Sequence, residues 1–226
     1  MKVPPKRIES VGAREGYDLW SESYDLTPNP VVAMDSRHTV GLLDPEAGEL
    51  ILDAGCGTGR NLKKLIQAGS DAVGIDFSHQ MLRVAQRQIA NPAIALANLQ
   101  ADLPFRDELF DAVLCALIGE HLDDLRFVFK QFFRVLKKGG RLVFSVYHPR
   151  MSAAGIEANF ERDGVEYRLG AVHYSTDEHV RLICEAGFKG TEVYEFSADE
   201  ELITSIPSAL KYLGSPILLI LKAQRV

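Results

Sequence analysis

A glycine-rich segment between two apolar stretches carries the residues with the most specific chemistry in this chain. Residues 53–59 read DAGCGTG, so an aspartate is followed by three glycines at alternate positions. The apolar run 50–52 before it predicts a buried strand, and a second apolar run ends in Asp76, 21 positions after Gly55. An acid at this spacing suits a carboxylate that reaches the hydroxyls of a ribose.

The glycine-rich turn predicts a nucleotide site, because glycine allows close approach of a ligand and the following helix start offers free N–H donors. A dinucleotide usually shows G-x-G-x-x-G, whereas this turn shows G-x-G-x-G. Asp53, two residues before Gly55, would repel a pyrophosphate but attract an ammonium and a sulfonium. We therefore interpret the loop as a site for S-adenosyl-L-methionine, which carries both cations and no phosphate. The alternative is a tight turn that only packs a strand on a helix.

Residues 53–59 resemble motif I of the class I S-adenosylmethionine-dependent methyltransferases, and residues 134–140, RVLKKGG, resemble the same family before its fifth strand. The resemblance covers residues 50–147 well and the flanks loosely. It implies an α/β, doubly wound, Rossmann-like sheet of seven strands, mostly parallel with an antiparallel last strand and helices on both faces. The cofactor-binding residues that it implies are Tyr24, Asp53, Gly55, Cys56, Gly57, Gly59, Asp76, Phe77, Met81, Asp102, Leu103 and Leu117.

Two of these roles depend on the resemblance most directly. In the family, an aspartate at the end of the third strand accepts from the adenine amino group, and Asp102 with the Leu103 backbone matches it. A Tyr-Asp pair ahead of the core lies over the cofactor in similar small-molecule methyltransferases, and Tyr24-Asp25 matches that pair. Tyr17, Trp20 and Tyr24 share one face of an expected helix. That face is either a lid over the cofactor or ordinary core.

The periodicities divide one expected domain, residues 1–226, into four parts: a helical N-terminal lid at 1–48, a cofactor-binding core at 49–147, an acceptor-side insertion at 148–175 and the rest of the sheet at 176–226. Thr27 to Pro30 should break the lid, and Asp163-Gly164 should turn a hairpin. The expected strands are 50–52, 71–75, 94–99, 110–117, 141–147, 191–196 and 217–222. The expected helices follow Gly59, Ser78 and His121, with the last capped by Gly139-Gly140, and a further one runs from Ser175 to Gly187.

Composition excludes several classes of protein. A net charge of −6 and a pI near 5.5 argue against a nucleic-acid partner. The apolar run 217–221 is too short to span a bilayer, and residues 1–10 lack the apolar core of a signal peptide. Cys56, Cys115 and Cys184 have no metal or disulfide spacing, so we expect no metal and a cytoplasmic protein.

Methyl transfer from a sulfonium requires alignment, exclusion of water and, for a protonated acceptor, a base. The catalytic group stays unassigned, with His148, His173 and His121 as candidates, because a lone histidine is more often structural. Cys56 as a nucleophile has no visible base.

The expected acceptor is a small molecule or a carrier-bound group, since the flanks look most like malonyl-carrier-protein and quinone methyltransferases. Residues 117–121, LIGEH, replace the Asn/Asp-Pro-Pro-aromatic motif of base methyltransferases. A nicotinamide-dependent oxidoreductase is disfavoured by Asp53. A cofactor-binding protein without catalysis and a protein methyltransferase remain open, as does the oligomeric state.

Overall fold

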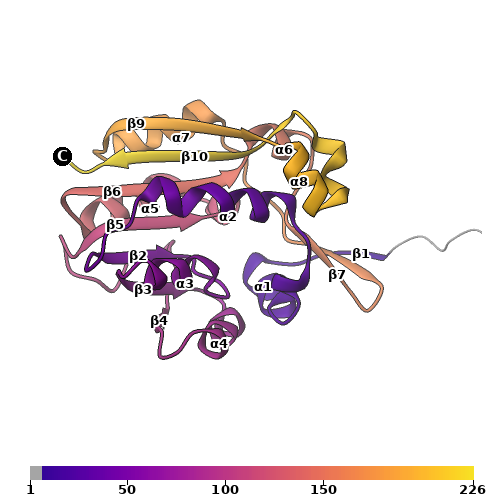
Figure 1. The fold of residues 1–226 in the computed structure, drawn as a ribbon, viewed down its shortest axis with the longest axis horizontal. Helices are drawn as coiled ribbons and strands as arrows, with labels where there is room; N and C mark the ends of the chain where they lie inside the picture. The colour runs from indigo at the N-terminus through magenta and orange to yellow at the C-terminus, as the bar shows by residue number, and fades with distance from the viewer. Residues whose placement is uncertain (1–6) are drawn as a thin grey trace, which may run out of the picture.

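The computed structural model describes residues 7–226, so the first six residues of the expected lid lie outside the described part. The main sheet contains β2 Leu50–Ala54, β3 Asp71–Asp76, β4 Ala93–Leu96, β5 Phe110–Ala116, β6 Leu136–Tyr147, β9 Lys189–Ser197 and β10 Pro216–Gln224. Its order is β4-β3-β2-β5-β6-β10-β9, and Figure 1 shows this order from bottom to top. Only β10, the last strand, runs antiparallel to its neighbours in this sheet. The expected seven-stranded, doubly wound sheet is confirmed.

Helices cover both faces of the sheet, because consecutive residues of a buried strand point to opposite faces. Ile51 packs in the apolar layer under one set of helices, and Leu52 packs in the layer under the other set. The first set is α2 Pro30–Leu43, α3 Arg60–Gln67 and α8 Glu200–Ser205, and the second is α5 Leu125–Val135 and α7 Thr176–Glu185. The helix α4 His79–Gln88 follows β3 beside the edge strand β4.

A second, three-stranded sheet lies beyond the carboxyl ends of the parallel strands. It contains β1 Arg7–Ser10, β7 Asn159–Arg162 and β8 Val165–Arg168, in the order β1-β8-β7. The hairpin turn has positive φ at Asp163 (52°) and Gly164 (76°), as a two-residue primed turn requires, so this prediction is confirmed. The expected N-terminal lid, residues 1–48, is not helical throughout. Residues 7–10 form the strand β1, because they pair in parallel with the distant strand β8.

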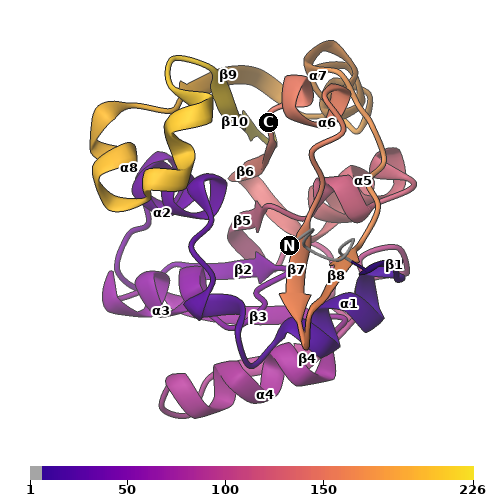
Figure 2. The ribbon, with the colours of Figure 1, turned by 90° about the vertical axis from the view of Figure 1, so that its right-hand side faces the viewer.

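The rest of the N-terminal segment, up to Leu43, is mainly helical, and its first part lies at the carboxyl ends of the parallel strands. The helix α1 Ala13–Trp20 ends earlier than expected, and the short 3-10 turn η1 Tyr24–Leu26 follows it. The next helix begins at Pro30, and the side chain of Asn29 accepts from the first free backbone N–H groups. Figure 2 shows α1 and the β7–β8 hairpin in front of the sheet. Within residues 7–226, every helix is too short or too polar to cross a membrane.

Two further expected boundaries are wrong. The edge strand β4 stops at Leu96 rather than Leu99, so residues 97–100 form a loop. The helix α5 ends at Val135, and β6 begins at once rather than after a Gly139-Gly140 cap. The glycine pair instead lies in an irregular part of the strand, where the Gly139 N–H donates to the Arg225 carbonyl at 2.6 Å.

Candidate functional site

The glycine loop between β2 and α3 adopts a conformation that other residues rarely take. Gly55, Gly57 and Gly59 have φ of 82°, 53° and 88°. A Cβ at Gly55 would also lie 2.7 Å from Cδ1 of Ile118, which follows β5. The loop therefore needs glycine both for its turn and for the close approach of the neighbouring strand.

Asp76 connects this loop to the end of β3. Its Oδ2 accepts from the Gly57 N–H at 2.9 Å, and its Oδ1 accepts from the Ser78 N–H at 2.8 Å. Burial raises the pKa of Asp76, while these backbone N–H donors oppose the rise. Each oxygen keeps a second lone pair, so the carboxylate can hold the loop and still accept from a ligand hydroxyl.

Two small cavities, of 60 and 50 Å³, meet at Asp76 and together trace one elongated groove. The first extends along the glycine loop to the start of α3, and the second extends to the loop at 97–100 after β4. Both are lined by Tyr17, Gly55, Asp76, Phe77 and Ile118. The lining of the first adds Tyr24, Cys56, Gly57, Thr58, Arg60, Asn61, Met81, Ala116 and Leu117, so the structure brings most of the expected cofactor residues together.

Asp53 lies beneath the loop and outside the lining of both cavities. It is 1% exposed, and among the described residues its Oδ2 has no hydrogen-bond partner. Burial raises the pKa of Asp53 to about 7, although the Arg60 guanidinium opposes the rise. An unpaired buried acceptor at this position fits a ligand that brings positive charge to the loop.

The N-terminal segment is fastened to the cofactor loops from above. The Thr58 hydroxyl donates to Asp25 at 2.9 Å, and the Ser78 hydroxyl donates to Asp18 at 2.6 Å. Tyr17 and Tyr24 line the groove, as a cover would. Trp20 does not, because it is 3% exposed and stacks on the Phe160 ring at 5.0 Å. The aromatic face therefore divides into two tyrosines that reach the groove and one tryptophan that is core.

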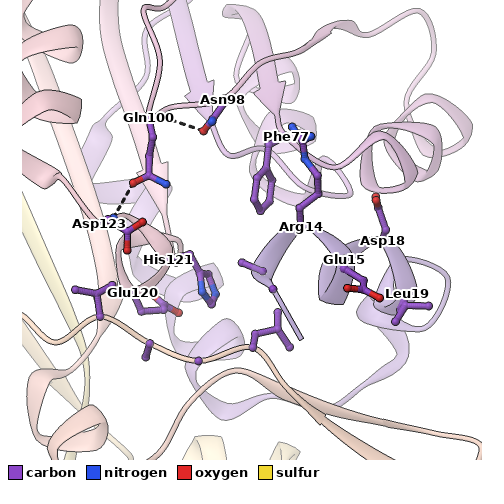
Figure 3. Close-up of a pocket in the computed structure, with 16 residues that line it drawn as sticks. Arg14, Glu15, Asp18, Leu19, Phe77, Asn98, Gln100, Glu120, His121 and Asp123 are labelled. Carbon is purple, nitrogen blue, oxygen red and sulfur yellow. Dashed lines mark hydrogen bonds between the residues drawn. The ribbon is translucent and has the colours of Figure 1, made fainter. Parts of the chain in front are cut away.

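A larger cavity of 910 Å³ opens beside the second small one, with which it shares Phe77, Asn98, Gln100 and His121. Figure 3 shows its walls: α1 on one side, the residues after β5 on another, and the segment 169–172. Four carboxylates and one guanidinium contribute to the lining, namely Glu15, Asp18, Glu120, Asp123 and Arg14. Asp18 is already engaged by Ser78, and Arg14 lies over the Phe77 ring at 5.7 Å. The cavity is therefore acidic.

The three candidate histidines lie in different surroundings. His148 caps the short helix α6 Pro149–Ala153 through Nδ1, and its Nε2 lies 3.1 Å from the Glu195 carboxylate. His173 is exposed and lies outside the lining of all three cavities. His121 lines two of them, and its Nε2 is hydrogen-bonded to the Tyr17 hydroxyl at 3.0 Å. Burial lowers the pKa of His121 to about 4, so its ring is neutral at pH 7.

The structure places Asp102 and Leu103 away from the groove. The Gln131 amide donates to Asp102 at 3.0 Å, and the Leu103 N–H donates to the same amide group at 3.1 Å. Because β4 ends early, residues 97–100 reach the second cavity instead, and Asn98 and Leu99 line it.

Sequence reasoning missed two charged residues of this region. Arg60, the first residue of α3, forms an ion pair at 2.6 Å with Asp35 of α2, which is fully buried. Glu120 follows β5, and burial raises its pKa to about 7. Arg60 stands next to the glycine motif and was visible as a candidate. The sequence carried no signal for the burial of Glu120, which depends on the packing of α1 and residues 169–172.

Comparison with known proteins identifies the group to which this architecture belongs. Residues 52–144 match the family model described as a methyltransferase domain. The demethylmenaquinone methyltransferase of Tropheryma whipplei (strain Twist) is 32% identical over 202 residues, which cover 79% of this chain and 84% of the relative. The ubiquinone biosynthesis O-methyltransferase of Idiomarina loihiensis is 32% identical over 195 residues, which cover 80% of this chain and 74% of the relative.

Solved structures agree on the fold. An S-adenosylmethionine-dependent methyltransferase from Mesorhizobium loti has a TM-score of 0.69 and 24% identity, covering 82% of this chain and 95% of its own. A possible histamine N-methyltransferase from Thermotoga maritima has a TM-score of 0.71 and 21% identity, covering 94% and 99%. With the glycine loop, Asp76 and the seven-stranded sheet in place, the chain belongs to the class I S-adenosylmethionine-dependent methyltransferases.

Proposed function

We propose that this methyltransferase acts on a neutral small molecule that carries a hydroxyl group on an aromatic or quinol-type ring. The observation that carries the proposal is the acidic 910 Å³ cavity, which opens directly from the cofactor groove. Small-molecule sites typically measure about 300–1,000 Å³, so the cavity has room for a ring of this kind. Two relatives whose names refer to demethylmenaquinone and ubiquinone biosynthesis support a quinol-type acceptor.

The acidic lining disfavours an anionic acceptor. Glu15, Glu120 and Asp123 face the cavity with only Arg14 of opposite sign, and its guanidinium lies over an aromatic ring. A carboxylate or phosphate in this space would meet like charges in a partly desolvated site. This argues against the carrier-bound acyl acceptor, whose prosthetic arm and acyl group are anionic.

The described residues fit S-adenosylmethionine, whose sulfonium supplies an electrophilic methyl group when the cofactor is bound. In our proposal, Asp76 accepts from the ribose hydroxyls, and Asn98 with Leu99 holds the adenine in place of Asp102. Gly57 and Thr58 hold the amino-acid end, where Asp53 contributes negative charge. The roles of the lining residues follow from their places along the groove, whereas Asp53 does not line it and would act through its charge beneath the glycine loop.

The N-terminal segment, residues 11–30, is proposed to cover the bound cofactor and exclude water. Tyr17 and Tyr24 line the groove, while Asp18 and Asp25 accept from hydroxyls of the cofactor loops. Cavities of 60 and 50 Å³ are too small for a whole nucleoside with an amino-acid tail, so this cover has to move for the cofactor to bind.

An acceptor screen tests the proposed function. Purified protein with S-adenosylmethionine is offered three sets of acceptors: hydroxylated quinols and phenols, primary amines, and carboxylated acyl thioesters. Release of S-adenosylhomocysteine and the mass of the methylated product are measured. We expect turnover with the first set only. Turnover confined to amines or thioesters would overturn the proposal.

A further inference from the structure

Glu120 occupies a position where the fold has no structural need for a carboxylate. It belongs to the 3-10 turn η2 Gly119–His121, directly after β5 and next to Ile118, which lines both cofactor cavities. Its side chain is 8% exposed, yet neither carboxylate oxygen has a hydrogen-bond partner within residues 7–226. Leaving such a group unpaired costs stability, so a purely structural carboxylate would normally have a partner.

The titratable groups that interact with Glu120 come from several elements. They are Cys115 of β5, Tyr17 of α1, Tyr24 of η1, Tyr147 of β6 and the adjacent His121. The negative charge of Glu120 adds to burial in raising the pKa of each of the three tyrosines. No lysine or arginine in the described chain forms an ion pair with it. A ligand that brings a hydrogen-bond donor would therefore meet an acceptor without competition from a cation.

Other candidate bases near the groove are already engaged. His121 is hydrogen-bonded to Tyr17, and its lowered pKa makes it a weak base. His148 uses both ring nitrogens, one for the Arg150 N–H and one beside Glu195. Of the groups that wall the large cavity, Glu120 combines deep burial with free oxygens, and Figure 3 shows it beside His121 on the wall that faces α1.

We propose that Glu120 is the general base that accepts the hydroxyl proton of the acceptor. As the acceptor oxygen bonds to the methyl carbon, the carbon–sulfur bond breaks and its electron pair returns to sulfur. The hydroxyl proton moves to the Glu120 carboxylate, so one positive and one negative charge cancel, and the proton later leaves to solvent. The inference rests on the proposed function, because an acceptor without an ionisable hydroxyl would need no such base.

The test compares Glu120→Gln with Asp71→Asn, which changes an exposed carboxylate at the start of β3, outside the lining of all three cavities. With a weakly acidic phenol or quinol as acceptor, Glu120→Gln should lower kcat by about 100-fold to 10,000-fold, and Asp71→Asn should change it little. A nitro-substituted phenol that is already ionised at the assay pH should bind more weakly because of the acidic lining, but at saturating acceptor the loss of kcat in Glu120→Gln should shrink to a few-fold. Calorimetric titration should give both variants the wild-type affinity for S-adenosylhomocysteine.

An equal loss of kcat with both acceptors would overturn the inference, since a positioning or structural role does not depend on the acidity of the acceptor. So would a Glu120→Gln variant with wild-type turnover of the weakly acidic acceptor. If Glu120→Gln does not fold, Glu120→Asp serves in its place, with an intermediate loss confined to the weakly acidic acceptor. Wild-type protein that methylates only amines or thioesters would instead refute the proposed function, and the two failures are thus distinguishable.

Discussion

The cofactor side and the acceptor side of this enzyme are assembled in different ways. The cofactor side is local: the bond between Gly57 and Asp76 joins residues only 19 positions apart, within one strand–helix–strand unit. The proposed acceptor side joins distant segments, since its cavity is lined by residues of α1, of the loop after β4, of the turn after β5 and of the segment 169–172. Binding of the cofactor is thus encoded in a short motif, whereas the acceptor cavity exists only once the tertiary fold has formed.

The two sides also treat their buried carboxylates differently. Asp76 accepts from two backbone N–H groups, whereas Glu120 accepts from no group in the described chain. A satisfied carboxylate stabilises its loop, and an unsatisfied one destabilises the fold when it ionises. This difference gives the largest effect that we expect.

Stability should fall with pH because of Glu120. Its pKa is about 7 in the fold and close to 4.5 when unfolded, so the folded state retains a proton that the unfolded chain has released. The resulting stability is complete below pH 4.5 and is lost as pH rises through 7, by about 2–4 kcal/mol. Glu120→Gln should therefore be more stable than wild type at pH 8, with the advantage declining toward pH 4.5, as urea unfolding at each pH will measure.

Glu15→Gln is the control for this series, because Glu15 lines the same cavity but is exposed. Asp53, whose pKa is also raised by burial, is present in all three proteins and cancels in the comparison. Parallel pH curves for wild type and Glu120→Gln would show that Glu120 is not an unpaired buried acid.

Asp76→Ala should weaken S-adenosylmethionine binding by about 1.5–3 kcal/mol, because it removes charge-assisted bonds to the ribose and frees the glycine loop. Calorimetric titration measures the effect. Asp71→Ala, at the exposed start of the same strand, should bind as wild type does. If a folded Asp76→Ala variant had an unchanged dissociation constant for S-adenosylmethionine, Asp76 would not be a cofactor-binding residue.

Tyr24→Ala and Phe160→Ala separate the cover from the core. Both rings contact Trp20, at 4.9 and 5.0 Å, but only Tyr24 lines the cofactor groove. Tyr24→Ala should weaken cofactor binding by about 1 kcal/mol. Phe160→Ala should mainly lower thermal stability, because that ring is 3% exposed.

Hydrogen exchange should show that bound cofactor protects residues 11–30 in wild type. Equal hydrogen-exchange rates at residues 11–30 with and without cofactor would show that this segment is part of the core and not a cover over the cofactor.

Asp102→Ala should have the smallest effect, less than about 0.5 kcal/mol on cofactor affinity, because Asp102 is exposed and bound to Gln131. Asn98→Ala, in the loop that lines the second cavity, should cost more. A larger loss of cofactor affinity in Asp102→Ala than in Asn98→Ala would indicate that Asp102, and not Asn98, contacts the adenine.

Local pattern was sufficient for the individual strands and for the glycine loop, whereas the seven-stranded sheet with an antiparallel last strand was expected from the family resemblance. Apolar strands, the spacing from Gly55 to Asp76, and the Asp163-Gly164 turn each act within a few residues to a few tens of residues. Boundaries failed where tertiary pairing decided them, as at β1, which is a strand only because β8 lies beside it.

The candidate site divides along the same line. Tyr24, Met81 and Leu117 line the groove where the family resemblance placed them. The proposed shift of the adenine contact from Asp102 to Asn98 follows from the early end of β4, which no single-sequence pattern marks. Glu120 and the Asp35–Arg60 pair depend on burial between segments far apart in sequence, so their charge states could not be inferred from neighbouring residues.

Parallel calorimetric titrations with S-adenosylmethionine and with NAD test most directly whether the glycine loop serves a cationic nucleoside. The single tryptophan, Trp20, packs against Tyr24 and provides a fluorescence signal from the cover in the same samples. We predict saturable binding of one S-adenosylmethionine per chain with a change in Trp20 emission, and no saturable heat with NAD. Saturable binding of NAD, or none of S-adenosylmethionine, would contradict the assignment of the loop.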